Sequence, residues 1–349
     1  MLPNFDPQGI IGDQDGEMTA ENLKELLEKA AGKMATPSGK VEGLRRLSGG
    51  ASQETWSFVL SGPQGTTPLI LRRTPGGKHS AKTGTAVPLA TEAAVIARAA
   101  KAGVQVPDVA YVLQDANGLG EGYIMSRIEG ETIARKILRD EAYAAARGKL
   151  AFQCGEALAK IHAADVSGVE GLPTLGLAPQ LQTYFDLYDG MGEAHPVFEL
   201  AFRWLEDNKP DGEPAKLVHG DFRNGNIIVG EDGLRAVLDW ELCHLGDPME
   251  DLGWICVNSW RFGESQNPVG GFGQYKELFD GYEAAGGAKV SPARVKYWEV
   301  FGTLKWGIMC MLMVSAFRTG MDRSVERAAI GRRASETEID LLNLLAVES

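Results

Sequence analysis

Short apolar runs separated by turns dominate the part of the chain from residue 41 to residue 128. Compact apolar runs of this length are typical of β-strands, and Gly62-Pro63-Gln64-Gly65 is a typical turn between two of them. The expected strands lie near 41–48, 54–61, 67–73, 108–114 and 121–128. A helix is expected from about Pro88 to Ala102. The pattern therefore predicts five strands and one helix in this region.

From about residue 139 onward, the apolar residues follow a helical spacing instead. Ala151, Cys154, Leu158 and Ile161 fall on one face of a long helix. Further helices are expected near 178–190, 195–208, 247–262, 272–285, 291–318 and 322–346. The chain is therefore predicted to be an α+β protein, with a small sheet domain at 41–127 and a mainly helical domain at 128–349.

Residues 1–40 form a third segment with a different pattern. Residues 1–17 are irregular and rich in glycine, proline and aspartate, whereas Thr19 is a suitable cap for a following helix. The apolar face of that helix would comprise Leu23, Leu26, Leu27, Ala30 and Ala31. We expect an N-terminal arm and a helix that packs on one of the two domains.

The composition excludes several classes of function. At 349 residues the chain exceeds the size of a usual single core, which favours two lobes or domains. Its apolar content of 44% and charged content of 23% are ordinary for a soluble globular protein. A net charge of -12 argues against a general binder of nucleic acid or of anionic membranes, because such binding depends on neutralising phosphates.

Cysteine usage and the absence of targeting patterns predict a cytoplasmic protein. The 4 cysteines are scattered without a C-x-x-C pair, so neither a disulfide framework nor a zinc site is expected. Residues 1–20 contain no apolar core of a secretory signal. The apolar run from Gly307 to Phe317 follows Lys305 and is too short to span a bilayer, so we expect a buried helix there.

The candidate chemistry gathers between Leu217 and Asp251. His219-Gly220-Asp221 follows an apolar lead-in, and Asn226 begins the first of two short apolar runs joined by a tight turn. The second run ends at Asp239. Asp221, Asn226 and Asp239 would thus present oxygen side chains close together. Mg²⁺ prefers oxygen ligands, and phosphoryl transfer needs a carboxylate to orient the attacking hydroxyl.

The pattern H-G-D-x-x-x-x-N followed by a strand-terminal aspartate resembles the catalytic and metal-binding segments of the aminoglycoside phosphotransferase and choline kinase superfamily. The continuations Asp239-Trp240-Glu241 and L-G-D-P-x-x-D-L-G, from Leu245 to Gly253, resemble the subgroup of kinase-like domains fused to acyl-CoA dehydrogenases. This resemblance implies a protein-kinase-like two-lobed fold, with a small five-stranded antiparallel sheet lobe carrying one helix and a large helical lobe.

The same resemblance implies roles for individual residues of this chain. Asp221 would be the catalytic base, Asn226 and Asp239 would be Mg²⁺ ligands, and Asp251 would be a buried carboxylate bracing the catalytic loop. His219 would be structural. His162 is interpreted as a hydrogen-bonded core histidine, because the role of proton acceptor is already filled.

The resemblance also implies a site for ATP or GTP in the small lobe. The turn Ser48-Gly49-Gly50 occupies the place of a nucleotide-covering loop, although a plain turn explains it as well. Arg72 stands where kinases carry a lysine, and Glu92 would pair with it, unless Glu92 is a solvated helical residue. The hinge between the lobes is placed at Met125 to Ile128, so that Met125 and Arg127 would lie beside the base.

These observations predict an ATP-dependent kinase that phosphorylates a hydroxyl of a small molecule. A hydroxyacyl thioester is one candidate for this acceptor. A nucleotide-binding regulator without catalysis and an aminoglycoside- or choline-type kinase remain the alternatives. The chain has no P-loop, dinucleotide, zincin or nucleophile-elbow motif. A functional link to an acyl-CoA dehydrogenase is a further expectation.

The acceptor side is the least explicit part of the sequence. Aromatic residues that could line its pocket, or simply pack in the core, are Trp254, Trp260, Tyr275, Tyr297 and Trp306. A basic cluster comprises Arg318, Arg323, Arg327, Arg332 and Arg333, to which Arg72, Arg73, Lys78 and Lys82 are added. On an acidic chain this cluster indicates an anionic acceptor, although a solvated helix face explains it almost as well.

Overall fold

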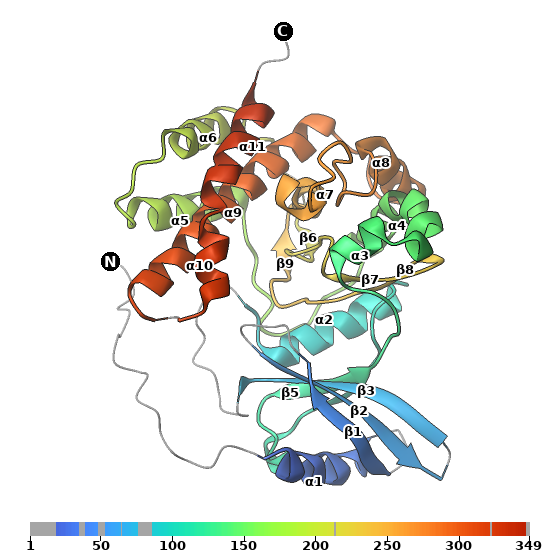
Figure 1. Ribbon diagram of the computed structural model, residues 1–349. Coiled ribbons are helices and arrows are strands. Elements are labelled where there is room, and N and C mark those ends of the chain that lie inside the picture. Colours follow the sequence, from blue (N-terminus) through green and yellow to red (C-terminus); the bar gives the residue numbers. More distant parts are fainter. Residues whose placement is uncertain are drawn as a thin grey trace. The chain divides into compact units, whose positions relative to one another are not determined.

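The computed structural model describes residues 19–34, 39–47, 53–63, 65–75, 86–212, 214–321 and 323–346 (Figure 1). Within them, the chain forms two compact units: residues up to 82 together with Val109–Arg127, and residues 83–108 together with 128 onward. The chain passes from the first unit to the second directly after Arg127. We refer to them as the sheet unit and the helical unit.

The sheet unit contains a single antiparallel sheet with the strand order β1-β2-β3-β5-β4. Its strands are β1 (Lys40–Arg46), β2 (Glu54–Gly62), β3 (Gly65–Arg73), β4 (Val109–Val112) and β5 (Gly122–Ser126). The predicted five-stranded antiparallel sheet is therefore confirmed. Phe58 and Leu60 of β2 and Leu69 and Leu71 of β3 occupy alternate positions and share one core cluster, so one face of the sheet is turned into a core.

Helix α1 (Ala20–Ala31) completes that core. Thr19 caps it as expected, since its side-chain oxygen accepts a hydrogen bond from the N–H of Asn22 at 3.2 Å. Leu23 and Leu27 are buried in one cluster with Phe58 and Leu71 of the sheet. The N-terminal helix is thus part of the sheet unit and supplies apolar surface that the five strands would otherwise leave exposed.

The helical unit holds most of the helices (Figure 1). They are α2 (Leu89–Lys101), α3 (Ala134–Arg139), α4 (Ala144–His162), α5 (Leu177–Asp189), α6 (Pro196–Asp207), α7 (Met249–Cys256), α8 (Tyr275–Ala284), α9 (Pro292–Arg318), α10 (Val325–Gly331) and α11 (Ala334–Leu345). Two small antiparallel pairs lie among them, β6 (Lys216–Val218) with β9 (His244–Gly246), and β7 (Ile227–Gly230) with β8 (Gly233–Val237).

Several features of this unit differ from the sequence-based expectation. Helix α2, expected in the small lobe, groups by its contacts with the helical unit. The single helix expected at 322–346 is two helices, because the chain turns at Arg332 and Arg333. Before that turn, Gly331 lies so close to Val314 of α9 that a side chain would not fit. Strand β9 was not foreseen, because three residues are too few to show a period.

Helix α9 forms the centre of the helical unit. It packs against α5, α6, α7, α10 and α11. By length and composition it could cross a membrane, but 56% of its most apolar window is buried within the structure. Its apolarity is accounted for by the neighbours that surround it. The buried helix predicted at Gly307–Phe317 is buried mainly up to Met311, whereas residues 312–316 are partly buried and Phe317 is exposed.

Helices α4 and α8 cross at two glycines, and this crossing generates a stability prediction. A Cβ on Gly155 would overlap the carbonyl oxygen of Leu278, and a Cβ on Gly281 would overlap that of Phe152. We expect Gly155→Ala to lower the free energy of unfolding by more than about 1 kcal/mol, because backbone must move to relieve the overlap. The measurement is urea denaturation.

Gly148 in the same helix provides the matched control. Nothing lies within 4 Å of the position of its Cβ. Gly148→Ala should therefore be neutral or stabilising by up to about 1 kcal/mol, since alanine is the better helix former. Equal unfolding midpoints for the two variants would contradict the proposed close approach.

Candidate functional site

The loop from His219 to Asn226 is held at both ends by paired strands. It leaves β6, which pairs with β9, and enters β7, which pairs with β8. Gly220 has a φ of 81°, and a Cβ there would overlap the carbonyl oxygen of Leu242. Only glycine fits this position without strain. The loop is therefore fixed by its backbone before any side chain acts.

Asp251, in the first turn of α7, braces this loop from below the surface. Its Oδ2 accepts a hydrogen bond from the N–H of His219 at 2.8 Å, and its Oδ1 accepts one from the N–H of Gly220 at 2.9 Å. The Nε2–H of His162 donates to Oδ2 at 3.1 Å. Burial acts to raise the pKa of Asp251, but the hydrogen bond and charge of His162 outweigh it and hold the pKa below its ordinary value.

Both histidines near the loop have structural roles, as predicted. His219 Nε2 donates to the carbonyl oxygen of Leu238 at 3.0 Å, so Nδ1 can accept the N–H of Asp221 at 3.2 Å. This arrangement needs the neutral ring, and burial indeed lowers the pKa of His219. His162 joins Asp251 to the hydroxyl of Tyr282, which lies 2.9 Å from its Nδ1. The two rings connect the loop to α4 and α8.

Asp221 is the half-buried carboxylate at the centre of the loop. Its Oδ1 accepts the indole N–H of Trp254 at 2.8 Å and the Nε–H of Arg223 at 3.0 Å. Its Oδ2 accepts the amide nitrogen of Asn226 at 2.6 Å. Three donors from the loop and from α7 thus fix the orientation of the carboxylate. A carboxylate held in a fixed orientation can accept a proton from a hydroxyl bound beside it.

Asn226 and Asp239 are brought together by the β7–β8 hairpin. The backbone oxygen of Asn226 accepts the N–H of Leu238 at 2.8 Å, and Asp239 is the next residue. Asp239 has a φ of 66°, which is uncommon outside glycine. Strain of this kind persists only where the surroundings enforce it, and it often marks a functional residue.

The oxygens of this pair fit a metal held jointly by protein and phosphate. The amide nitrogen of Asn226 donates to Asp221, so the amide oxygen is the side-chain atom of Asn226 suited to a metal, and Asp239 adds a carboxylate. The described residues contain no group of three or more His, Cys, Asp or Glu suited to hold a metal by themselves. Two protein ligands suit Mg²⁺, which retains water or phosphate oxygens in most of its coordination sphere.

The sequence did not predict that Arg223 and Trp254 contact Asp221. Trp254 was considered only for the acceptor pocket or the core, and Arg223 was not singled out. The guanidinium of Arg223 lies 4.6 Å from the ring centre of Trp260, which packs against Trp254. Trp260 therefore contacts two of the three groups that donate to Asp221. The sequence signals were the Arg in H-G-D-F-R and the Trp after D-L-G.

The residues predicted for nucleotide binding fall in both units. Arg72 of β3 donates from Nε to Gln53 Oε1 at 2.6 Å, and Met125 and Arg127 lie at the end of β5 or just beyond it. Glu92 is buried on α2 in the helical unit. Its pairing with Arg72 stays a prediction. Ser48, Gly49, Gly50, Lys78 and Lys82 lie outside the described residues.

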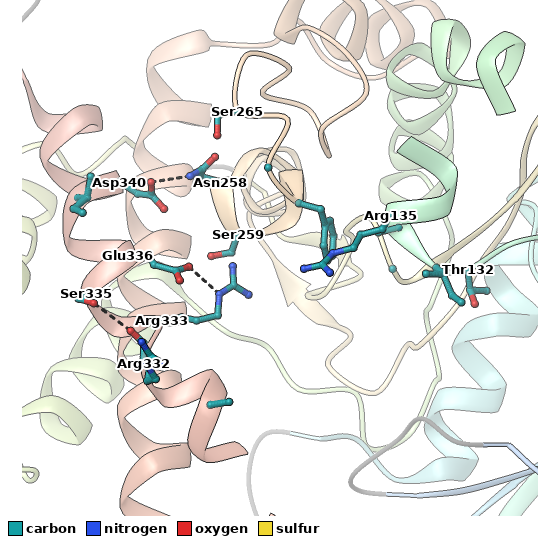
Figure 2. Close-up of a pocket in the computed structure, with 17 residues that line it drawn as sticks. Thr132, Arg135, Asn258, Ser259, Ser265, Arg332, Arg333, Ser335, Glu336 and Asp340 are labelled. Atoms are coloured by element: carbon teal, nitrogen blue, oxygen red, sulfur yellow. Dashed lines mark hydrogen bonds and ion pairs between the residues drawn. The ribbon is translucent and has the colours of Figure 1, made fainter. Parts of the chain in front are cut away.

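A pocket of about 1270 Å³ lies beside the loop within the helical unit (Figure 2). Gly225, the residue before Asn226, lines it, together with residues of α3, α10, α11 and the segment that follows α7. Arg332 and Arg333 of the predicted basic cluster line it, whereas Arg318 forms an ion pair with Glu193 elsewhere. Arg73 is buried against Glu54 and is not available to a ligand.

The aromatic residues predicted for the acceptor side do not line this pocket in the part of the chain that the structure describes. Trp254, Trp260 and Trp306 instead pack together in a small cluster. Tyr275 donates its hydroxyl to Glu299 at 2.8 Å, and Tyr297 packs in the core. Trp254, Trp260 and Tyr297 are buried, as the core interpretation expects, whereas Tyr275 and Trp306 are only partly buried.

Comparison with known proteins identifies the chain's relatives. The family model "Phosphotransferase enzyme family" matches residues 43–287, more than half of the chain. Acyl-CoA dehydrogenase family member 11 of Gallus gallus is 32% identical over 228 residues, which cover 62% of this chain and 28% of that protein. The chain thus matches less than a third of the length of this curated relative.

Solved structures show the same fold. A protein of Ralstonia eutropha assigned to the aminoglycoside phosphotransferases superposes with a TM-score of 0.70 at 20% identity, covering 92% of this chain and 97% of that one. Aminoglycoside phosphotransferase APH(4)-Ia, in a ternary complex with AMP-PNP and hygromycin B, gives a TM-score of 0.61 at 17% identity and covers 94% and 100%. The kinase-like α+β fold is therefore confirmed.

The contacts of Asp251 predict a large loss of stability on its removal. Asp251→Ala would leave two buried backbone N–H groups and His162 without their acceptor, so the free energy of unfolding should fall by more than about 2 kcal/mol. Because the folded pKa is depressed, this contribution is present above the unfolded pKa of about 4 and is lost as the pH falls below it.

Urea denaturation at pH 7 and near pH 3 measures both effects. Asp280, exposed on α8 and paired with Lys276, is the control, and Asp280→Ala should change the free energy by less than about 0.5 kcal/mol. An Asp251→Ala midpoint equal to that of the wild type at pH 7 would show that the loop does not depend on this carboxylate.

Proposed function

We propose that this chain, which belongs to the phosphotransferase enzyme family, transfers the γ-phosphoryl group of ATP or GTP to a hydroxyl group of a small molecule. The observation that supports this most directly is the orientation of Asp221. Its carboxylate is half-buried and held by three donors, and the same loop contributes Gly225, four residues further along, to the lining of the pocket. A carboxylate so held is suited to orient a hydroxyl as it attacks.

The proposed step is an in-line displacement at phosphorus. The acceptor oxygen forms a bond to the γ-phosphorus, the bond from phosphorus to the bridging oxygen of the nucleoside diphosphate breaks, and the hydroxyl proton passes to the carboxylate of Asp221. Trp254 and Arg223 keep that carboxylate oriented. Arg223 also places a positive charge beside the reacting groups, where negative charge is concentrated.

Asn226 and Asp239 would hold Mg²⁺ by oxygen atoms. When bound, the ion would neutralise phosphate charge and help to fix the phosphates for transfer. The hydrogen bond from Leu238 to Asn226 keeps the two ligands at a fixed separation without using their side-chain oxygens. The hairpin therefore supplies a rigid frame for the pair.

Arg72, together with Glu92, is proposed to place the nucleotide phosphates, and Met125 to Arg127 to contact the base. Arginine can bind phosphate oxygens through two parallel hydrogen bonds, so it can replace a lysine with a different contact geometry. A regulator without catalysis would have no need of a held base together with a pair of oxygen ligands, which favours an enzyme over that alternative.

The acceptor and the cellular setting follow as finer parts of the proposal. A hydroxyacyl thioester is one candidate acceptor, because acyl-CoA dehydrogenase family members are among the relatives, and a functional link to such a dehydrogenase is proposed. An aminoglycoside- or choline-type acceptor is the alternative, because aminoglycoside phosphotransferases and a choline/ethanolamine kinase family protein are among the similar solved structures. A cytoplasmic location is proposed from the reduced, scattered cysteines.

Replacing the proposed base separates binding from transfer. Asp221→Asn should keep nucleotide affinity and lose phosphoryl transfer by about 10²-fold or more, the usual scale for removal of a positioned base. Nucleotide affinity is measured by calorimetry and transfer by release of the nucleoside diphosphate in the presence of a panel of hydroxylated metabolites. Transfer at the wild-type rate would exclude this role for Asp221.

Replacing the proposed metal ligand tests the other half of the site. Asp239→Ala should abolish Mg²⁺-dependent nucleotide binding or turnover and leave the melting temperature nearly unchanged, because Asp239 is only partly buried. Asp232→Ala, in the turn of the same hairpin and exposed beside Arg235, should retain both. Full Mg²⁺ dependence in the Asp239 variant would remove Asp239 from the metal site.

A further inference from the structure

The charged groups that line the pocket are not balanced. Three guanidinium groups face two carboxylates: Arg135 reaches in from α3, and Arg332 and Arg333 stand on the side of α10 and α11 (Figure 2). This excess of positive charge stands out on a chain whose net charge is -12. Because electrostatic complementarity governs the choice of small charged ligands, the sign of the excess carries information about the occupant.

Both carboxylates of the pocket are already engaged by protein groups. Glu336 accepts the Nε–H of Arg333 at 3.0 Å, and Asp340 accepts the amide of Asn258 at 2.8 Å. Burial raises the pKa of Asp340, which weakens its charge further. A cationic acceptor would therefore find no uncommitted carboxylate among the described residues of this lining.

Arg135 and Arg332 differ from the other charged residues of the pocket. Neither side chain has an ion-pair or hydrogen-bond partner among the described residues, and both residues are exposed and line the pocket. Guanidinium groups bind carboxylates and phosphates through paired hydrogen bonds, which are stronger than neutral ones. The two arginines are thus available to a ligand, whereas Arg333 is partly satisfied by Glu336.

The backbone of the pocket supports a binding role. Phe262 lines it with a φ of 49°, and it and Asp239 are the two non-glycine residues with positive φ in the described part of the chain. A bulky residue in this region of φ is an outlier, and such strain concentrates at functional sites. Gly225 connects the same pocket to the loop of Asp221.

We propose that Arg135 and Arg332 form an anion-binding subsite that holds a carboxylate or phosphate group of the acceptor while its hydroxyl lies at the Asp221 loop. This deepens the proposed function and rests on it for the identity of the ligand as an acceptor. The sequence assigned anion binding to a wider basic cluster, whereas this proposal assigns it to two residues. Arg135 and Arg332 lie nearly two hundred positions apart in the chain.

The test compares alcohols that differ by one anionic group. The probes are 3-hydroxybutyrate against 1,3-butanediol, and glycerol 3-phosphate against glycerol, with Mg²⁺ and AMP-PNP present to occupy the nucleotide site. Dissociation constants of the full chain are measured by titration calorimetry or ligand-observed NMR at low and moderate salt. The first pair reports a carboxylate and the second a phosphate, so the two sources of the anion are distinguished.

At least one anionic probe should bind about tenfold or more tightly than its neutral partner, the scale of a charge-assisted hydrogen bond. Added salt should weaken this preference, because exposed charges are screened over about 8–10 Å. The variant Arg135→Gln/Arg332→Gln should lose the preference, and Arg318→Gln, whose arginine pairs with Glu193 outside the pocket, should retain it. Equal binding of charged and neutral probes, or an unchanged preference in the double variant, overturns the subsite.

These binding measurements do not depend on turnover. An anion preference that the double variant loses, without phosphorylation of any probe by ATP and Mg²⁺, would retain the subsite and count against the proposed function. Phosphorylation of the anionic probes with KM values unaffected by the two substitutions would retain the function and remove the subsite.

Discussion

The carboxylate of Asp251 is the constraint on which the candidate site depends. Two consecutive backbone N–H groups, of His219 and Gly220, donate to its two oxygens, so the direction of the loop is set before Asp221 is reached. An ionised carboxylate without solvent is costly, and only the three donors around it make its burial favourable. The arrangement is therefore cooperative: the loop needs Asp251, and Asp251 needs the loop.

The same constraint extends to the proposed metal ligands. His219, whose N–H is held by Asp251, donates through Nε2 to Leu238, and Leu238 donates through its N–H to Asn226. Leu238, which follows β8, is thus hydrogen-bonded to both ends of the loop, and Asp239 is the next residue. His219, Asn226 and Leu238 are therefore joined by hydrogen bonds although they are separate in the sequence. These bonds explain how short strands of three to five residues can position a site.

The sequence predicted those parts of the site that local pattern determines. The spacing from Asp221 to Asn226 and the hairpin to Asp239 follow from turn and strand signals, and Thr19 and the five strands follow from caps and periodicity. Contacts between distant segments could not be predicted in this way. Trp254 meets Asp221 only because α7 packs beneath the loop, and Arg135 meets the α10–α11 side only through the tertiary fold.

The C-terminal arginines illustrate why charge patterning alone is a weak guide. In the sequence, these arginines are equally good candidates for binding an anion. In the structure, Arg332 and Arg333 lie between α10 and α11 and line the pocket, whereas Arg318, at the end of α9, pairs with Glu193. Gly331, the last residue of α10, lies against Val314 of α9 just before the break between α10 and α11, at a position where a side chain would not fit. The close packing of α10 on α9 at this glycine is a tertiary contact, so which of the arginines line the pocket could not be predicted from the run of charges alone.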